Sequence, residues 1–241
     1  MEQVRCYGCM NLKTSRPVCE HCGYNENTNN APHQLPVGTM LNNQYMVGRV
    51  LGQGGFGITY LGWDMHLDTP IAIKEYYPNN FVTRDTAYSL EVSGFEGHKK
   101  DLFYSSRERF LREAKALARF TDVPEIVRVH NFFECNNTAY IIMEYIHGID
   151  LKRYIARRGG KLSVEETFTI LKPVIEAVSI VHKAGLVHRD ISPDNIMMLS
   201  KTRAKLLDFG AVRDVGEADA DKELSKSTEA ILKHGFAPME Q

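Results

Sequence analysis

A glycine-rich segment, GQGGFG at residues 52–57, has the spacing G-x-G-x-x-G. In a dinucleotide-binding fold this motif opens a helix, but here β-prone runs follow it at residues 58–61 and 71–74. The sequence therefore predicts a strand-loop-strand flap, whose backbone N–H groups can cover phosphate oxygens. A Rossmann fold is not supported, and the chain also lacks the G-x-x-x-x-G-K-[ST] motif of P-loop nucleotide folds.

Apolar periodicity places this flap in an antiparallel sheet. Strand-like runs cover residues 45–52, 57–63, 70–76, 126–133 and 139–145. One helix is predicted at residues 107–120, where apolar residues recur at helical spacing: Phe110, Leu111, Ala114, Leu117 and Ala118. Residues 77–106 mix polar and aromatic residues without a clear period, so no element is predicted there.

Beyond residue 147 the sequence becomes helical in character. Ser163 and Glu166 have the spacing of a capping box, and Gly185 is expected to end the helix that begins there. The apolar face of this helix is predicted to comprise Phe168, Leu171, Ile175, Val178 and Val181. The chain has 241 residues, of which 43% are hydrophobic, so it can form one or two domains with buried cores.

Four of the five cysteines form two C-x2-C pairs within the first 22 residues: Cys6, Cys9, Cys19 and Cys22. Two such turns can direct four thiolates at one ion, which predicts a structural Zn2+ site without an open coordination position. The alternatives are a redox C-x-x-C, unligated cysteines, or His21 in place of one cysteine, and the duplicated spacing favours zinc. Residues 1–24 resemble small bacterial zinc ribbons, and we expect the metal to maintain this segment only.

The polar run NENTNNAP at residues 25–32 has little to bury, so residues 25–44 are predicted to be a linker. Lys and Arg total 29 against 30 for Asp and Glu, and the resulting net charge of −1 favours neither nucleic acid nor an anionic membrane as partner. We find no apolar stretch long enough to span a membrane and no signal core. The expected location is therefore the cytoplasm, without a membrane segment.

Two further motifs contain residues suited to phosphoryl transfer, HRDISPDN at 188–195 and DFG at 208–210. The carboxylates of Asp190 and Asp208 and the carboxamide of Asn195 could hold Mg2+ and orient a hydroxyl group. Taken in order with the glycine flap and Lys74, these motifs resemble a protein kinase over residues 45–241. GGFGITY, KEYYP, HRDISPDN and the zinc ribbon are together similar to bacterial eukaryotic-like serine/threonine kinases.

The resemblance implies an α+β, two-lobed fold preceded by the ribbon. The small lobe and hinge would span residues 45–146, with an antiparallel sheet and one helix. The mainly helical large lobe would span 147–241 and include the catalytic loop and activation segment. Protein kinases continue past their A-P-E region with several helices, whereas here the similar segment ends at Glu240, so we expect a C-terminally truncated, incomplete large lobe.

The resemblance also implies how ATP is bound. Gly52, Gly54 and Gly57 match the loop over the ATP phosphates, and Lys74 matches the lysine that contacts the α and β phosphates. The residues expected around the adenine and hinge are Thr59, Ala72, Met143, Glu144, Ile146 and Met197.

The catalytic residues follow from the same resemblance. Glu113 matches the helix glutamate that pairs with the strand lysine, and Glu108 is the alternative. Asp190 matches the catalytic base, while Asn195 and Asp208 match the Mg2+ ligands. The implied activity is transfer of the ATP γ-phosphate to Ser or Thr hydroxyls of a protein substrate.

One departure from the family pattern favours an alternative, a catalytically weak kinase-like binding module. Ser192 stands where serine/threonine kinases usually carry a lysine that touches the transferred phosphate.

Arg189 could pair with a phosphate added to the activation segment at Ser225, Ser227 or Thr228. A homodimer that phosphorylates itself is the expected self-association.

Overall fold

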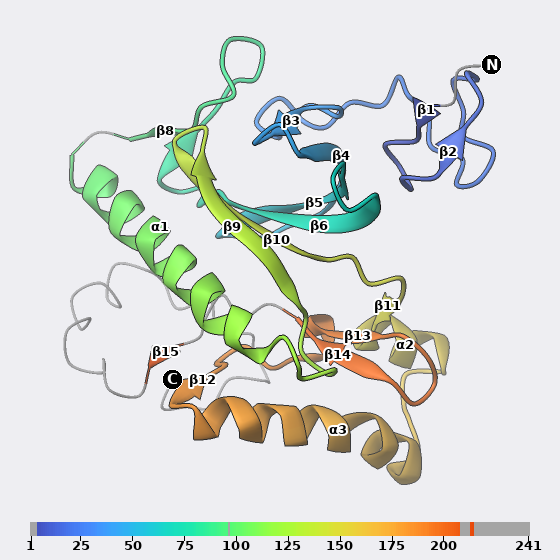
Figure 1. Ribbon diagram of the computed structural model, residues 1–241. Coiled ribbons are helices and arrows are strands. Elements are labelled where there is room, and N and C mark those ends of the chain that lie inside the picture. The colour runs from blue at the N-terminus through green and yellow to red at the C-terminus, as the bar shows by residue number, and fades with distance from the viewer. Residues whose placement is uncertain (1–3, 96, 208–212, 215–241) are drawn as a thin grey trace. The chain divides into compact units, whose positions relative to one another are not determined.

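The computed structural model describes residues 4–95, 97–207 and 213–214 of the chain. It divides into two compact units, one made of Met1–Arg112 and Val129–Tyr145 and the other of Glu113–Arg128 and Ile146–Gln241. Figure 1 gives the order of the elements along the chain.

The first unit contains a six-stranded antiparallel sheet with strand order β3-β4-β5-β6-β10-β9. Its strands are β3 (Met40–Leu41), β4 (Tyr45–Gln53), β5 (Gly57–Asp64), β6 (Thr69–Tyr76), β9 (Val129–Cys135) and β10 (Thr138–Glu144). The predicted sheet is confirmed, and its bounds differ from the predicted ones mainly at β9. The glycine-rich segment connects β4 to β5, as a strand-loop-strand flap requires.

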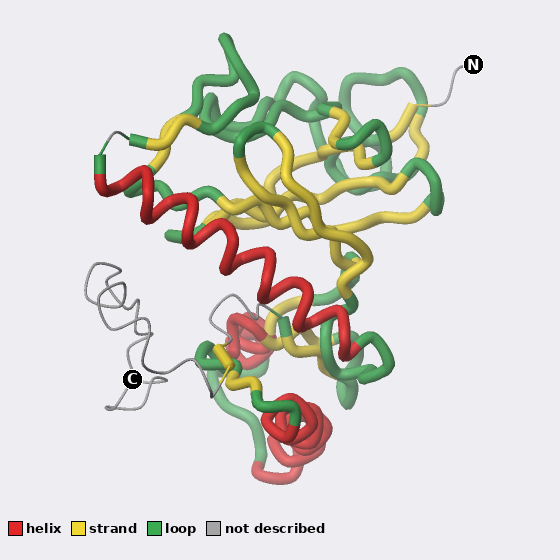
Figure 2. Tube along the Cα trace, turned by 60° about the vertical axis from the view of Figure 1, so that its left-hand side comes forward, coloured by secondary structure: helices red, strands yellow, loops and turns green. Residues whose placement is uncertain are grey.

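Helix α1 spans His98–Leu117 and continues as the 3-10 turn η1 at Ala118–Phe120. It lies along one face of the sheet (Figure 2), where Tyr76 packs against Phe103 and Phe110 at ring-centroid distances of 5.6 and 5.4 Å. The helix therefore begins at His98 rather than near residue 107. Its first half is rich in polar residues, and between residues 100 and 107 only Leu102 and Phe103 are buried, so it shows no sustained apolar period.

The rest of the segment without a predicted element is also folded. A short hairpin pairs β7 (Val82–Thr83) with β8 (Ser93–Gly94). The loop around it returns to the sheet, because the Val92 N–H donates to the Asn136 carbonyl at 2.8 Å and the Asn137 carboxamide donates to the Val92 carbonyl at 2.7 Å.

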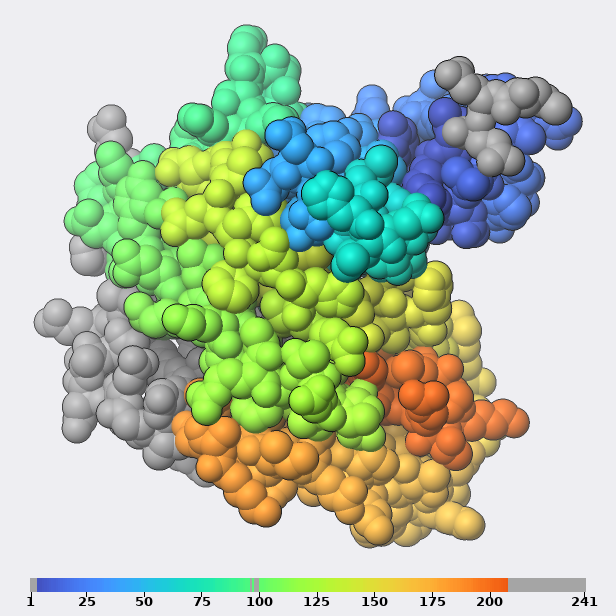
Figure 3. Space-filling view, in the orientation of Figure 1, coloured from blue at the N-terminus to red at the C-terminus, as the bar shows by residue number. Residues whose placement is uncertain are grey.

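The cysteine module, with β1 (Val4–Arg5) and β2 (Leu12–Lys13), packs against the sheet. Met10 belongs to one apolar cluster with Leu61 and Trp63, and the Arg5 guanidinium lies 3.4 Å from the centre of the Trp63 ring. In Figure 3 the dark-blue module lies directly against the cyan part of the sheet. The Arg49 side chain completes the contact by donating to the Gly8 carbonyl at 2.8 Å. The module therefore shares a core with the sheet.

Residues 25–44, which the sequence predicts to be a linker, make specific contacts with the sheet. The Leu35 side chain is fully buried, and its N–H donates to the Tyr60 hydroxyl at 3.0 Å. Asn30 donates to the Gly48 carbonyl at 3.1 Å. Two buried leucines six residues apart, Leu35 and Leu41, give no periodic signal, so these tertiary contacts have no counterpart in the sequence pattern.

The second unit combines helices with short strands. Its described helices include α2 (Leu151–Arg157) and α3 (Val164–Lys183), with the 3-10 turn η2 (Pro193–Asn195). A three-stranded sheet contains β11 (Ile149–Asp150), β13 (Ile196–Met198) and β14 (Ala204–Leu206), and β12 (Leu186–Val187) pairs with β15 (Arg213–Asp214). Among the described residues, no helix is both long and apolar enough to cross a membrane.

Helix α3 starts and stops where the sequence predicts. The Ser163 hydroxyl accepts from the Glu166 N–H, the Glu166 carboxylate accepts from the Ser163 N–H, and Gly185 follows the helix with φ of 81°. The predicted apolar face is only partly right. The side chains buried on α3 are Ile170, Val174, Ala177 and Val181, whereas Phe168 and Ile175 are exposed.

Candidate functional site

The glycine-rich loop is closed by a hydrogen bond from the Gly54 N–H to the Gly57 carbonyl at 2.9 Å. A Cβ atom at Gly57 would lie far inside the van der Waals radius of the Glu75 carbonyl on the next strand, so this position accepts only glycine without a shift of the strand. At Gly52 and Gly54 a Cβ would meet nothing within 4 Å. These two backbones are therefore open to an approaching group.

Strand register gathers the residues expected near a nucleotide on one face of the sheet. Thr59 lies opposite Lys74, and Ala72 lies opposite both Leu61 and Met143. Directly opposed residues point to the same face, as do residues two apart on one strand. One face of the sheet therefore contains Thr59, Ala72, Lys74 and Met143. Tyr76 lies on the same face, and its ring packs there against Phe103 of α1.

Glu144 ends β10 opposite Ile71, so strand alternation places its side chain on the other face. Ile146 and Met197 belong to the second unit, where Met197 lies half-buried on β13 opposite Lys205 and Asp150. The second unit therefore contains the last residue of the expected hinge, Ile146, and the expected adenine contact Met197.

Burial separates the two candidates for the helix carboxylate. Glu113 is 9% exposed, whereas Glu108, five residues earlier on α1, is exposed. A buried carboxylate is costly without a compensating partner, and Glu113 does take part in a further interaction. This difference favours Glu113 over Glu108 as the functional carboxylate.

The HRDISPDN segment folds into a turn that brings Asp190 and Asn195 together. The Asn195 carboxamide donates to the Asp190 Oδ2 at 2.7 Å and to the Asp190 carbonyl at 2.9 Å. Arg189 adopts a left-handed backbone with φ of 62°, a conformation that costs a residue with a Cβ about 1–2 kcal/mol. Such strained backbones persist where the surrounding contacts dictate the geometry.

Those contacts come from His188 and Leu207. The buried His188 ring lies with Nε2 3.0 Å from the Leu207 carbonyl, and its Nδ1 accepts from the Asp190 N–H at 3.2 Å. The Leu207 N–H donates to the Asn195 carbonyl at 2.7 Å. Both backbone groups of Leu207 are thus tied to the turn. Asp208, the other expected Mg2+ ligand, lies outside the described residues.

The expected phosphorylation sites Ser225, Ser227 and Thr228 and the A-P-E-like segment also lie outside the described residues. Ser192 is 2% exposed, so the position that replaces the usual lysine is closed. Close to Ser192 in the chain, Asp194 pairs with a cation, Lys152 on α2, whose ammonium group lies 3.1 Å from the Asp194 carboxylate.

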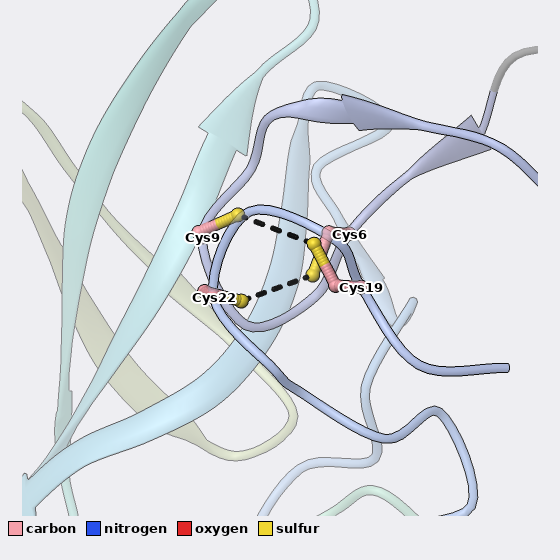
Figure 4. Close-up of side chains that lie close together, drawn as sticks. All are labelled: Cys6, Cys9, Cys19 and Cys22. Carbon is pink, nitrogen blue, oxygen red and sulfur yellow. Dashed lines mark hydrogen bonds between the residues drawn. The ribbon is translucent and has the colours of Figure 1, made fainter. Parts of the chain in front are cut away.

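The four cysteines of the module converge on one point (Figure 4). The Sγ atoms of Cys6 and Cys22 are 3.7 Å apart and those of Cys9 and Cys19 are 3.9 Å apart, and all four lie within 4.8 Å of one another. Zinc–sulfur bonds of about 2.3 Å in a tetrahedron require sulfur–sulfur distances of about 3.8 Å. The four thiols therefore fit one tetrahedral ion.

Two similar knuckles produce this convergence. The Met10 N–H donates to the Cys6 carbonyl at 2.7 Å, and the Gly23 N–H donates to the Cys19 carbonyl at 2.9 Å. Met10 and Gly23 occupy equivalent left-handed positions, with φ of 61° and 72°. Glycine suits such a position better than methionine. The contact that the Met10 side chain makes with the sheet offsets this backbone strain.

Electrostatics distinguish the four thiols. Burial raises the pKa of Cys6, Cys9 and Cys22. Burial acts in the same direction on Cys19, but hydrogen bonds, first among them that from the His21 N–H, outweigh it and lower the pKa to about 7. The His21 ring itself lies 3.1 Å from the Leu12 carbonyl. The clustered donor set is therefore the four cysteines, and most must lose a proton on binding metal.

The structure contains a buried polar network next to Lys74 that the sequence patterns do not reveal. Glu75, the next residue on β6, accepts two hydrogen bonds from Arg84, at 2.5 and 2.9 Å. It also accepts from the Tyr60 and Tyr140 hydroxyls at 2.8 and 2.9 Å. The available sequence signal is a charged residue at a position of β6 where alternation predicts a buried side chain.

This network is charged. Burial acts to lower the pKa of Arg84, but its hydrogen bonds and attraction to Glu75 outweigh burial and raise that pKa. Burial, reinforced by the negative charge of Glu75, raises the pKa of Tyr60 and Tyr140 well above the ordinary value, so both hydroxyls remain donors. A fully bonded buried pair of this kind holds its segments in one arrangement.

Comparison with known proteins places these features in a family. Residues 45–231 match the protein kinase domain. Serine/threonine-protein kinase PrkC of Bacillus subtilis is 32% identical over 174 residues, which is 72% of this chain and 24% of that protein. Serine/threonine-protein kinase B of Synechocystis is 29% identical over 235 residues, 93% of this chain and 38% of that protein. Such curated relatives are longer than this chain, which covers 21% of the length of one and 39% of another.

A solved structure supports the same assignment. The structure titled "PpkA-294 apo form" matches with a TM-score of 0.73 and 35% identity, over 87% of this chain and 71% of that one. The predicted α+β fold of the kinase type is therefore confirmed.

Proposed function

Because the chain belongs to the protein kinase family, we propose that it binds ATP with Mg2+ and transfers the γ-phosphate to Ser or Thr hydroxyls of proteins. The bacterial relatives named as serine/threonine kinases support this choice of acceptor. The proposal concerns the activity of a whole protein, whereas the chain spans only 21% of the length of one of these relatives.

Each motif has a distinct part in the proposed reaction. The open backbones of Gly52 and Gly54 would admit phosphate oxygens, and Lys74 would neutralise their charge. Asp190 would accept the proton of the substrate hydroxyl, and Asn195 with Asp208 would hold Mg2+. When bound, Mg2+ supplies charge neutralisation at the phosphates. Thr59, Ala72, Met143, Glu144, Ile146 and Met197 would surround the adenine.

The observation that carries the proposal is the hydrogen bond between Asn195 and the Asp190 carboxylate. It fixes the orientation of the carboxylate that would accept the proton of a substrate hydroxyl group. The strained backbone at Arg189 and the ties to Leu207 hold this geometry without a ligand.

The test is phosphate transfer from radiolabelled ATP to a protein acceptor, together with separate measurement of nucleotide binding. Asp190→Asn should lower turnover by about 10²–10⁴-fold, as expected for loss of a general base, and leave nucleotide affinity within about twofold. Asp194→Asn is the matched control, because this exposed carboxylate lies on the same turn and pairs with Lys152. Equal turnover of Asp190→Asn and wild type would contradict the proposal.

The alternative is a kinase-like module that binds partners without catalysis, which the closed Ser192 position favours. A wild-type chain that binds nucleotide but transfers no phosphate, with any acceptor, would support this alternative. Mixing wild type with Asp190→Asn tests self-association, since phosphate on the inactive copy requires transfer between two chains.

We propose separately that the four cysteines bind one structural Zn2+. The spacing of their sulfur atoms fits a tetrahedral ion and leaves no coordination position for a substrate. Four reduced thiols also favour a reducing compartment such as the cytoplasm. Elemental analysis should find about one zinc per chain, and Cys19→Ser should lower this content. A zinc content near zero in reducing buffer would refute the site.

A further inference from the structure

Gln53, which lies between Gly52 and Gly54 in the glycine-rich loop, is held by side chains from two other segments. Its Oε1 accepts a hydrogen bond from Gln34 Nε2 at 2.7 Å and lies 3.1 Å from His33 Nε2. Its Nε2 donates to Asn79 Oδ1 at 3.2 Å. The loop is thereby tied to residues 30–36, which we call the strap, and to the insertion after β6.

The strap is itself anchored to the sheet. Leu35 is buried, and its N–H donates to the Tyr60 hydroxyl. The Asn30 carboxamide donates to the Leu35 and Gly48 carbonyls at 2.7 and 3.1 Å, and it accepts from the Val50 N–H at 3.3 Å. The strap therefore cannot move away from β4 without breaking buried contacts.

Arg84 locks the other side of the strap. Its Nε and Nη2 donate to the His33 carbonyl at 2.9 and 2.7 Å, and its Nη1 and Nη2 also donate to Glu75. Thr86 donates to the Pro32 carbonyl from its N–H and its hydroxyl, at 3.0 and 2.8 Å. Arg84 and Thr86, which follow Lys74 in the chain, thus anchor the strap whose side chains contact Gln53.

No side chain packs on Gly52 or Gly54 at the position that a Cβ would occupy, where nothing lies within 4 Å. Glycine has more conformational freedom to lose than any other residue when it becomes ordered. An anchor at the residue between them removes part of this freedom before a ligand binds, and binding to an ordered loop is stronger.

We propose that the strap positions the glycine-rich loop for nucleotide phosphates, with His33 and Gln34 as positioning residues that act through Gln53. This inference rests on the proposed ATP-dependent function. It assigns residues 30–36, which precede the sheet, a part in nucleotide affinity.

A double-mutant cycle tests the strap. Gln34→Ala and Gln53→Ala should each weaken the binding of ADP with Mg2+ by about three- to tenfold, the range expected for loss of one or two exposed hydrogen bonds. Because both variants remove the same contact, the double variant should bind no more weakly than Gln53→Ala alone. The KM for ATP should rise in each variant with kcat little changed, and the melting temperature should stay near that of wild type. Gln44→Ala is the matched control, since it removes a glutamine hydrogen-bonded to Asp64 in the turn before β4.

Hydrogen exchange provides a readout that needs no nucleotide. The amides of residues 52–57 should exchange faster in Gln34→Ala than in Gln44→Ala. Unchanged affinity and exchange in Gln34→Ala, or fully additive losses in the double variant, would overturn the strap inference. A wild-type chain that binds no nucleotide would instead refute the proposed function, and the exchange comparison would still decide whether the strap restrains the loop.

Discussion

Met10 provides the sharpest test of how the cysteine module is joined to the kinase sheet. Its side chain is 1% exposed and packs with Leu61 and Trp63, although its backbone φ of 61° is unfavourable for a residue with a Cβ. Replacing a buried methionine by alanine costs about 2–5 kcal/mol. The total stability of a domain is only about 5–15 kcal/mol, so Met10→Ala should remove a large fraction of it.

The assay can be read directly at this contact. Trp63 is the only tryptophan of the chain, so the fluorescence change on unfolding reports the sheet beside Met10. A domain of this size loses about 2–4 °C in melting temperature per kcal/mol, which places the expected decrease for Met10→Ala at roughly 4–20 °C. Leu12→Ala, an exposed position in the same module, should change stability by no more than about 0.5 kcal/mol.

Met10→Gly separates the side chain from the backbone. Glycine relieves the left-handed strain of about 1–2 kcal/mol but makes the unfolded chain more flexible by about 0.5–1 kcal/mol. Met10→Gly should therefore be slightly more stable than Met10→Ala, and both should melt well below wild type. If Met10→Ala and Leu12→Ala gave the same Trp63 transition, the side chain would not couple the module to the sheet, and the metal would maintain residues 1–24 alone.

The remaining predictions concern the loop, the buried network and helix α3. Gly57→Ala should destabilise the protein by about 1–3 kcal/mol and raise the KM for ATP because its Cβ would overlap a backbone carbonyl of β6, whereas Gly52→Ala should leave the melting temperature nearly unchanged. Arg84→Met should cost about 3–5 kcal/mol in denaturant unfolding because it leaves a buried carboxylate without its cation, and a loss below 1 kcal/mol would contradict the network. Ser163→Ala should cost about 1 kcal/mol by removing the cap of α3. The Ser163 N–H lowers the pKa of Glu166. The stability that this hydrogen bond contributes is therefore present above the ordinary carboxyl pKa and is lost as the pH falls through the lowered value. The stabilities of wild type and Glu166→Gln, measured by unfolding across this pH range, should converge in acid.

Several arrangements that the sequence indicates are made by residues close together in the chain. Asp190 and Asn195 are five positions apart, and one turn is enough to bring them into hydrogen-bond contact. The two C-x2-C knuckles converge for the same reason, and the capping box of α3 lies within a single helical turn. Local spacing determines these geometries, because few backbone conformations can connect such closely spaced groups.

Tertiary structure alone determined what surrounds them. Glu75 and Arg84 are separated by a turn and a hairpin strand without periodic pattern, and their pairing depends on burial against the sheet. Gln34 and Gln53 are ordinary polar residues in sequence and meet only because the strap folds back over β4. The sequence determined the kinase motifs, the sheet and the cysteine site. Long-range packing determined how the ribbon and the strap join that sheet. No local sequence pattern predicts which distant residue a lone methionine or glutamine will contact.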